Sequence, residues 1–404
     1  MKTNKLPLEG VKIIDLTTII FGPLCTQILA DYGADVIKIE APEGDFSRHA
    51  GPTRVPSMGP MYVNLNRTKR GICLDLRKPN AVHALLRMCA SADIFISNVR
   101  PAALARLGLD YEKVRAVKPD IVYMSLVGYG QSGPYAKLPA VDDSLQAGSG
   151  IPALFMQSLQ GDPAYIPMNV ADRIAGNTAA HASLAALMMR DRCGESQFVE
   201  VPMFETVVAT VMGDHLMGET FTPASGPMGY TRILSPDRQP FRTKDGFISA
   251  TIYSEKHWRL FLPAIGHAAL QQSDPRFANA TERAKNYAMV YKFLADQFLM
   301  RRSGEWLEVL LQLDIPCFRV ESLESVIQDP HLAAVGMFQE YDHPSVGPMR
   351  SIRTPVFWDG VDLGVRRHAP AIGEHNNEVL REFGFDEDEI AALAVHSTKN
   401  QEMR

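Results

Sequence analysis

Basic and amide side chains gather in two loops that adjoin predicted strands: Arg67, Lys69 and Arg70 in the first loop, and Asn98, Arg100 and Arg106 in and after the second. Arginine and lysine pair with phosphate oxygens through charge-assisted hydrogen bonds. Ligands of open α/β sheets lie just beyond the carboxyl ends of the strands. One such cluster is better explained as a solvated turn, whereas two clusters next to strands favour an anionic cofactor.

The other polar residues form no known hydrolase, metal or dinucleotide motif. The eleven histidines include no HExxH pair, and no serine lies in a GxSxG elbow. Residues 17–23 lack GxGxxG, which disfavours a nicotinamide cofactor even though Glu40 ends the following strand. Residues 128–134 form either a flexible connection or a set of backbone N–H groups around a ligand. By spacing alone, Asp172 is an acid at a helix N-terminus, where the helix dipole favours it.

Strand-like and helix-like patterns alternate through the first part of the chain. Apolar runs typical of buried parallel strands occur at residues 11–16, 36–40, 70–76, 93–97 and 121–127. Helical segments separate these runs, so the sequence predicts a doubly wound α/β domain with right-handed crossovers. An Ala-, Leu- and Met-rich stretch then predicts a long helix over residues 172–190.

After this helix the pattern changes. Residues 197–201 alternate like a strand and residues 203–217 are helical, before a Gly/Pro-rich passage at 223–240 that indicates a domain boundary. A strand over 246–252 and helices over 257–313 are expected next. From residue 338 the chain is expected to be rich in loops, with a last helix over 378–383 before a polar tail.

Composition and charge limit the class of protein. The 404 residues are 46% hydrophobic and 22% charged, which predicts two or more units with large cores. A net charge of −5 gives no reason to expect a nucleic-acid partner. The five scattered cysteines form no CxxC pair, so neither disulfides nor a zinc site are expected. Residues 1–7 lack a signal-peptide core, and no apolar stretch approaches the roughly 18 residues of a membrane span. We therefore expect a cytoplasmic protein without a membrane partner.

Five sets of short motifs resemble those of the family III CoA-transferases, the group that includes formyl-CoA and carnitine CoA-transferases. They are GVKIIDL at residues 10–16 with ADVIKIE at 34–40, NRTKR at 66–70, NVRP at 98–101 with RLG at 106–108, GYGQSGP at 128–134, and GEHN at 373–376. Each motif is short, but their order and spacing run nearly from end to end and are specific together.

This resemblance implies an architecture and a ligand. The family has a large Rossmann-like domain built from both chain ends, here residues 1–222 and 336–404, and a smaller α+β domain, here residues 223–335. Two ring-shaped subunits interlock as a homodimer. Coenzyme A is a substrate, with no permanently bound cofactor and no metal. The matching coenzyme-binding positions are Lys38, Lys69, Arg70, Leu74, Asn98, Arg100 and Arg106.

The resemblance also gives Asp172 a role, because the aspartate at this place in the family is the covalent nucleophile. It attacks an acyl-CoA thioester to form a mixed anhydride, and the released thiolate converts the anhydride into an aspartyl-CoA thioester. A carboxylic acid acceptor then reverses the sequence, so coenzyme A moves from an acyl-CoA to a small carboxylic acid. Covalent catalysis of this kind divides one difficult exchange into easier steps. Backbone N–H groups of residues 226–230 are a candidate for stabilising the oxyanion.

Departures from the family pattern leave two other functions open. α-Methylacyl-CoA racemases resemble the family but carry an acid/base histidine where this chain has Val141, and valine cannot transfer a proton. A CoA-binding protein without turnover would not need Asp172.

Ile20 replaces a glutamine of the formyl-CoA members, and residues 225–229 do not reproduce their glycine run, which argues against formyl and oxalyl substrates. Arg48 and Arg54 are either contacts for a dicarboxylate or plain surface charges.

Overall fold

The computed structural model describes residues 5–395, which form two compact units. The first unit combines the chain up to Ser149 with Pro167–Ala209 and the chain from Pro330 onward. The second combines Gly150–Ile166 with Thr210–Asp329. Both ends of the described chain therefore belong to the first unit. The functional domain limits at residues 222 and 335 stay a prediction.

A six-stranded parallel sheet forms the centre of the first unit, in the order β3-β2-β1-β4-β5-β6. The strands are β1 (Lys12–Leu16), β2 (Asp35–Glu40), β3 (Arg70–Cys73), β4 (Ile94–Ser97), β5 (Val122–Val127) and β6 (Gln197–Pro202). Strands β3, β4 and β5 are buried along their whole length, as expected for a parallel sheet covered on both faces. The predicted doubly wound α/β pattern is confirmed as a mixed α/β fold around this sheet.

The direction of winding reverses between β1 and β4, which are neighbours in the sheet although β2 and β3 separate them in sequence. Helices that follow two such strands depart to opposite faces of the sheet. Open α/β sheets bind their ligands beyond the carboxyl ends of the strands at such a reversal, which here are β1 and β4. This edge contains the loops after residues 16 and 97.

The first unit also contains ten helices within residues 5–395, several of which cover the sheet. They are α1 (Phe21–Asp31), α2 (Pro60–Leu65), α3 (Pro79–Cys89), α4 (Pro101–Leu107), α5 (Tyr111–Val117), α6 (Asp142–Gly148), α8 (Val170–Cys193), α16 (Pro330–Ala334), α17 (Asn376–Glu382) and α18 (Glu387–Leu393), with a 3₁₀ turn at Phe46–His49. The longest is α8, which confirms the helix predicted over 172–190. It ends at Gly194, whose φ of 72° suits a left-handed helix cap.

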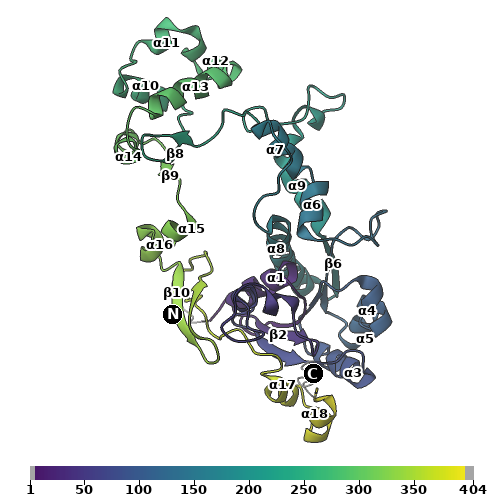
Figure 1. The fold of residues 1–404 in the computed structure, drawn as a ribbon. Coiled ribbons are helices and arrows are strands. Elements are labelled where there is room, and N and C mark those ends of the chain that lie inside the picture. Colours follow the sequence, from purple (N-terminus) through teal and green to yellow (C-terminus); the bar gives the residue numbers. More distant parts are fainter. Residues whose placement is uncertain (1–4, 396–404) are drawn as a thin grey trace, which may run out of the picture. The chain divides into compact units, whose positions relative to one another are not determined.

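The C-terminal part of the chain is more regular than its composition predicted. An antiparallel hairpin, β10 (Phe338–His343) and β11 (Gly347–Ile352), replaces part of the expected loop-rich stretch. Helix α18 follows α17, where only a polar tail was expected, and begins in a capping box formed by Asp386 and Glu389. Figure 1 shows α17 and α18 near α3, and residues of α18 complete the same apolar core as α3. Tertiary packing thus orders a polar segment.

The second unit has its own small sheet and core. Its elements are α7 (Ile151–Leu159), a 3₁₀ turn at Met217–Thr220, β7 (Phe241–Arg242), β8 (Phe247–Ala250), α10 (Glu255–Ala264), α11 (Leu270–Ser273), a 3₁₀ turn at Pro275–Phe277, α12 (Ala280–Lys285), α13 (Tyr287–Phe298), α14 (Ser303–Gln312), β9 (Cys317–Arg319) and α15 (Leu323–Val326). Helix α9 (Met203–His215) runs from the first unit into the second. The aromatic side chains of Trp258, Phe261, Phe298 and Trp306 pack together in the core.

Residues 5–395 contain no helix that is long and apolar enough to cross a membrane. Within the same residues, no group of three or more histidine, cysteine, aspartate or glutamate side chains is arranged to hold a metal ion. All five cysteines are free.

Candidate active site

Asp172 lies in the first turn of α8, three residues after Asn169, the N-terminal capping position. Its side chain is partly buried, whereas the neighbouring Arg173 is exposed. The first backbone N–H groups of a helix have no partner within the helix. The N–H of Asp172 is satisfied from outside α8, because it donates a 3.0 Å hydrogen bond to Oδ2 of Asp142. The Asp172 carboxylate is thus carried by a long helix whose N-terminal end is anchored by Asp142.

A close contact between α1 and α8 forms the other side of the site. Gly176, one helical turn after Asp172, is so near α1 that a Cβ atom there would lie 2.9 Å from the carbonyl oxygen of Phe21 and 3.0 Å from the side chain of Leu24. Phe21 is the first residue of α1, and its backbone N–H hydrogen-bonds the Asp172 carboxyl group. Gly176 is needed because any side chain would separate the two helices.

The loop before α1 is held in place by polar contacts from distant parts of the chain. Ile19 adopts a φ of 73°, unusual for a β-branched residue. Its N–H donates to Oδ1 of Asp45 at 3.1 Å. Asn98, after β4, forms two hydrogen bonds with the backbone of Thr18: it accepts from the N–H at 3.0 Å and donates to the carbonyl at 2.9 Å. The turn that leads to the Phe21 N–H is therefore fixed by the loop after the adjacent strand.

Burial first, and the nearby Asp142 carboxylate second, raise the pKa of Asp172 from 3.8 to about 6. The Phe21 N–H and Arg173 act against this rise because they favour the ionised form. A carboxyl group with this pKa is still mostly ionised at neutral pH. Its higher basicity makes it a stronger nucleophile than an exposed aspartate.

Asp142 is itself buried and fully engaged. Its Oδ1 accepts a 2.6 Å hydrogen bond from Nε2 of Gln146, one turn along α6, and its Oδ2 accepts from the N–H of Asp172. Val141, which occupies the place of the racemase histidine, caps α6 with 66% of its surface exposed. Spacing gave no signal for Asp142, because its partner lies 30 residues away.

Of the expected coenzyme-binding residues, Asn98, Arg100 and Arg106 lie in or just after the loop that follows β4, at the edge where the winding of the sheet reverses. Arg100 and Arg106 are exposed. Neither guanidinium makes a hydrogen bond or an ion pair with any other residue between 5 and 395. Arg100, at the N-cap of α4, and Arg106, in its last turn, thus carry two available positive charges.

Lys38 and Lys69 are placed differently from what a direct phosphate contact requires. Both are fully buried. Nζ of Lys38 donates to Asp45 Oδ2 at 2.9 Å and to the Thr17 carbonyl at 2.8 Å. Nζ of Lys69 donates to Asp15 Oδ2 at 3.1 Å and has three further acceptors. Burial lowers the pKa of Lys69 to about 8, against the opposing pull of Asp15. In this arrangement both lysines stabilise the loops near β1 and present no surface to a ligand.

Arg70 and Leu74 also have internal roles. Arg70 forms ion pairs with Asp35 and with Glu378 and Glu382 of α17, which joins the C-terminal segment to the sheet. The Leu74 side chain is fully buried in the apolar core. Neither side chain extends toward a free surface.

The expectation for Arg48 is corrected, whereas Arg54 is an exposed side chain. Arg48 is fully buried, donates from Nε to Glu40 at 2.8 Å and lies 3.6 Å from the centre of the Tyr62 ring. It is therefore neither a surface charge nor free to meet a dicarboxylate. Arg54 donates to the Pro348 carbonyl at 2.9 Å.

The loop over residues 128–134 is held by carboxylates. The backbone N–H groups of Gly130 and Gln131 donate to Glu205 and Glu200 at 2.8 and 3.0 Å. These two N–H groups are therefore not exposed for a ligand. In the second unit, the N–H groups of Gly229 and Tyr230 are taken by His215. The backbone donor at the Asp172 carboxyl group is instead that of Phe21, which sequence reasoning did not find.

Comparisons with known proteins identify the family. The model of CoA-transferase family III matches residues 8–376, so this chain belongs to that family and is an enzyme that transfers coenzyme A.

The relatives match over almost their full length. A succinate–glutarate CoA-transferase of Agrobacterium fabrum is 31% identical over 95% of this chain and 97% of its own. The human succinyl-CoA:glutarate CoA-transferase is 28% identical over 96% of this chain and 89% of its own. A crystal structure of a hypothetical protein from Mycobacterium tuberculosis superimposes with a TM-score of 0.81 at 29% identity, over 93% of this chain and 99% of that one.

Proposed function

We propose that this enzyme transfers coenzyme A through covalent intermediates on Asp172. One carboxylate oxygen attacks the thioester carbonyl of the donor, which forms a mixed anhydride and releases CoA thiolate. The thiolate attacks the aspartyl carbonyl, so the donor acid leaves and an aspartyl-CoA thioester remains. The acceptor carboxylate attacks this thioester and again releases the thiolate. The thiolate then takes the acceptor acyl group and regenerates the Asp172 carboxylate.

The environment of Asp172 is the observation that carries this proposal. Burial and Asp142 raise its pKa to about 6, which combines nucleophilicity with ionisation at neutral pH. The Phe21 N–H points at the carboxyl group, where negative charge develops each time the aspartyl carbonyl is attacked. A binding protein without turnover has no need of this costly burial of a carboxylate. Val141 leaves a racemase without one of its two proton-transfer groups.

Coenzyme A is proposed to bind at the sheet edge after β1 and β4. Asn98 would fix the loop, and Arg100 and Arg106 would meet phosphate oxygens. Lys38, Lys69, Arg70 and Leu74 would support this edge from within. Since the two arginines have no partner in the described part of the chain, R100Q and R106Q should raise KM for the acyl-CoA about tenfold each and leave kcat nearly unchanged. A drop in kcat at constant KM would contradict this placement.

Dicarboxylic acids are the proposed acyl donors and acceptors, because relatives that match the whole chain are named for succinate and glutarate. Interlocked ring-shaped subunits in a homodimer and a cytoplasmic location remain proposals from the family resemblance. Light scattering coupled to size-exclusion chromatography tests the first: a mass of one chain would exclude the dimer.

Chemical trapping tests the nucleophile. The enzyme is incubated with succinyl-CoA and hydroxylamine, and peptide mass analysis should locate a hydroxamate on Asp172. Asp172→Ala should lose transfer, whereas Asp143→Ala, which changes an exposed acid on α6, should keep it. No adduct from any of a panel of mono- and dicarboxylic acyl-CoA donors, or transfer that persists in Asp172→Ala, would refute the mechanism. Deuterium incorporation at the α-carbon without transfer would indicate a racemase.

A further inference from the structure

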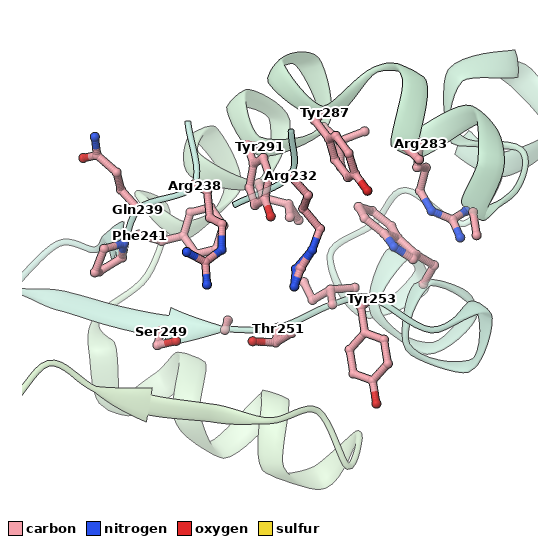
Figure 2. A pocket seen from close by; sticks show the side chains of 18 residues that line it. Arg232, Arg238, Gln239, Phe241, Ser249, Thr251, Tyr253, Arg283, Tyr287 and Tyr291 are labelled. Atoms are coloured by element: carbon pink, nitrogen blue, oxygen red, sulfur yellow. The ribbon is translucent and has the colours of Figure 1, made fainter. Parts of the chain in front are cut away.

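A cavity of about 410 Å³ lies entirely within the second unit (Figure 2). Its walls come from β8 and the segment after it, from α12 and α13, and from residues 232–241. The volume is within the range of sites for small molecules. None of the features described at Asp172 contributes to it, so its chemistry has to be derived from its own lining.

The charges that line the cavity are all positive. It is lined by Arg232, Arg238 and Arg283 and by no aspartate or glutamate. Arg283 is already neutralised, because it pairs with Glu255, donates to the Phe277 carbonyl at 2.8 Å and stacks on Trp258. Arg232 and Arg238 have no ion pair and no side-chain hydrogen bond with any residue between 5 and 395. Two guanidinium groups at one concave wall without a counter-charge repel each other, and an anion would relieve that repulsion.

The two free arginines converge on further hydrogen-bonding groups. In Figure 2 the side chains of Arg232 and Arg238 extend toward the side of the cavity formed by Ser249 and Thr251. Tyr291 belongs to α13, on the opposite wall. Burial raises the pKa of Tyr291, and both Arg232 and Arg238 are close enough to act against that rise. Hydroxyl and guanidinium groups thus line the same cavity.

The rest of the lining is apolar and aromatic. Phe241, Ile252 and Trp258 belong to the packed core of the unit, and Val290 and Leu294 extend the same surface from α13. A bare inorganic ion would leave this surface uncovered. An anionic group attached to a carbon skeleton or to a ring would cover it.

The geometry points to a second binding site in this cavity, for a small molecule whose carboxylate or phosphate group is held by Arg232 and Arg238. Guanidinium pairs with either group in two-pronged geometry. A free dicarboxylic acid and the phosphate end of a coenzyme A molecule are the two sources of such a group. The site does not rest on the mechanism proposed for Asp172, because no residue is shared.

Isothermal titration calorimetry with glutarate and with adenosine 3′,5′-bisphosphate tests the site. The full-length chain is compared with R232Q/R238Q and with R259Q, which removes an exposed arginine of α10 that does not line the cavity. At least one probe should bind wild type and R259Q alike, with binding weaker by more than about tenfold in the double variant. The probe that shows this loss identifies the source of the anion.

Equal affinity of wild type and the double variant for both probes, or no binding of either probe to wild type, would overturn the site. Arg238 is exposed, so R238Q should fold and carries the test if the double variant does not. Trapping at Asp172 should be unchanged in R238Q. If wild type binds a probe at this site but forms no adduct on Asp172, the result contradicts the proposed mechanism and not the second site.

Discussion

Replacing Asp172, the proposed nucleophile, with its neutral isostere asparagine should stabilise the protein while it abolishes transfer. In the folded protein the pKa of Asp172 is about 6, compared with 3.8 for an unperturbed aspartate. This rise of about 2 pH units corresponds to about 3 kcal/mol, at about 1.4 kcal/mol per unit. Ionised Asp172 therefore destabilises the folded state by up to that amount above pH 7. The side chain is partly exposed and lies at a helix N-terminus, so we expect about 1–2 kcal/mol from Asp172→Asn.

The stability that Asp172→Asn gains should depend on pH. A group whose pKa is raised on folding favours the folded state when protonated, and this advantage is lost as the pH rises through the folded pKa. Asp172→Asn removes the ionisation, so its benefit should be absent below about pH 4, grow between about pH 4 and 6, and be complete above about pH 7.

Thermal unfolding of wild type and variant across pH 4 to 8 is the assay. At pH 7.5 the Tm of Asp172→Asn should be higher by roughly 2–6 °C for a unit of this size. The control variant Asp143→Asn changes an exposed acid next to Asp142 in the sequence, and its Tm should not rise in this way. A Tm of Asp172→Asn at pH 7.5 that is equal to or below that of wild type would refute the reasoning that the folded state destabilises the ionised Asp172 carboxylate. The same gain in Tm at pH 4 would refute it as well.

Three further predictions concern groups that position the site. Asp142→Asn removes a negative charge beside Asp172, so the acid limb of kcat/KM should move to lower pH; a limb that stays in place would show that Asp142 does not act on that pKa. Gly176→Ala puts a Cβ atom 2.9 Å from the Phe21 carbonyl oxygen, so the rate of transfer should fall and the free energy of unfolding should decrease by about 1–3 kcal/mol. Unaltered kinetics would mean that α1 and α8 can move apart without a cost to activity. Lys69→Met leaves a buried acid unpaired, so the urea midpoint should fall by an amount equivalent to about 3–5 kcal/mol; unchanged stability would argue against the internal ion pair.

Local sequence patterns predicted the first unit well because they reflect local physics. Continuous apolar runs can be satisfied only as strands buried on both faces, and the parallel sheet contains a strand at each of the five predicted runs. The Ala-rich stretch after residue 170 has few alternatives to a helix. The hairpin β10–β11 and helix α18 were not predicted, because polar and proline-rich segments of this kind gain their order from the elements they pack against.

The basic loops show where spacing stops being informative. Arg67, Lys69 and Arg70 looked like an anion site, yet Lys69 pairs with an acid 54 residues away and Arg70 with one 312 residues away. No local pattern reports a partner at such separations. Arg100 and Arg106 gave the same signal in the sequence, yet neither has a side-chain partner among residues 5–395.

The site at Asp172 depends both on local sequence properties and on tertiary contacts. The sequence alone determined that a carboxylate stands at the start of a long helix, because helix propensity and the acid's position are local properties. Its motif context determined the family. Only the tertiary structure decided that the helix end is anchored by Asp142, that Gly176 admits the N-terminus of α1, and that the Phe21 N–H faces the carboxyl group. Burial, close approach and the field of a neighbouring charge depend on distances between residues far apart in the chain, and these distances are set when the whole sheet assembles.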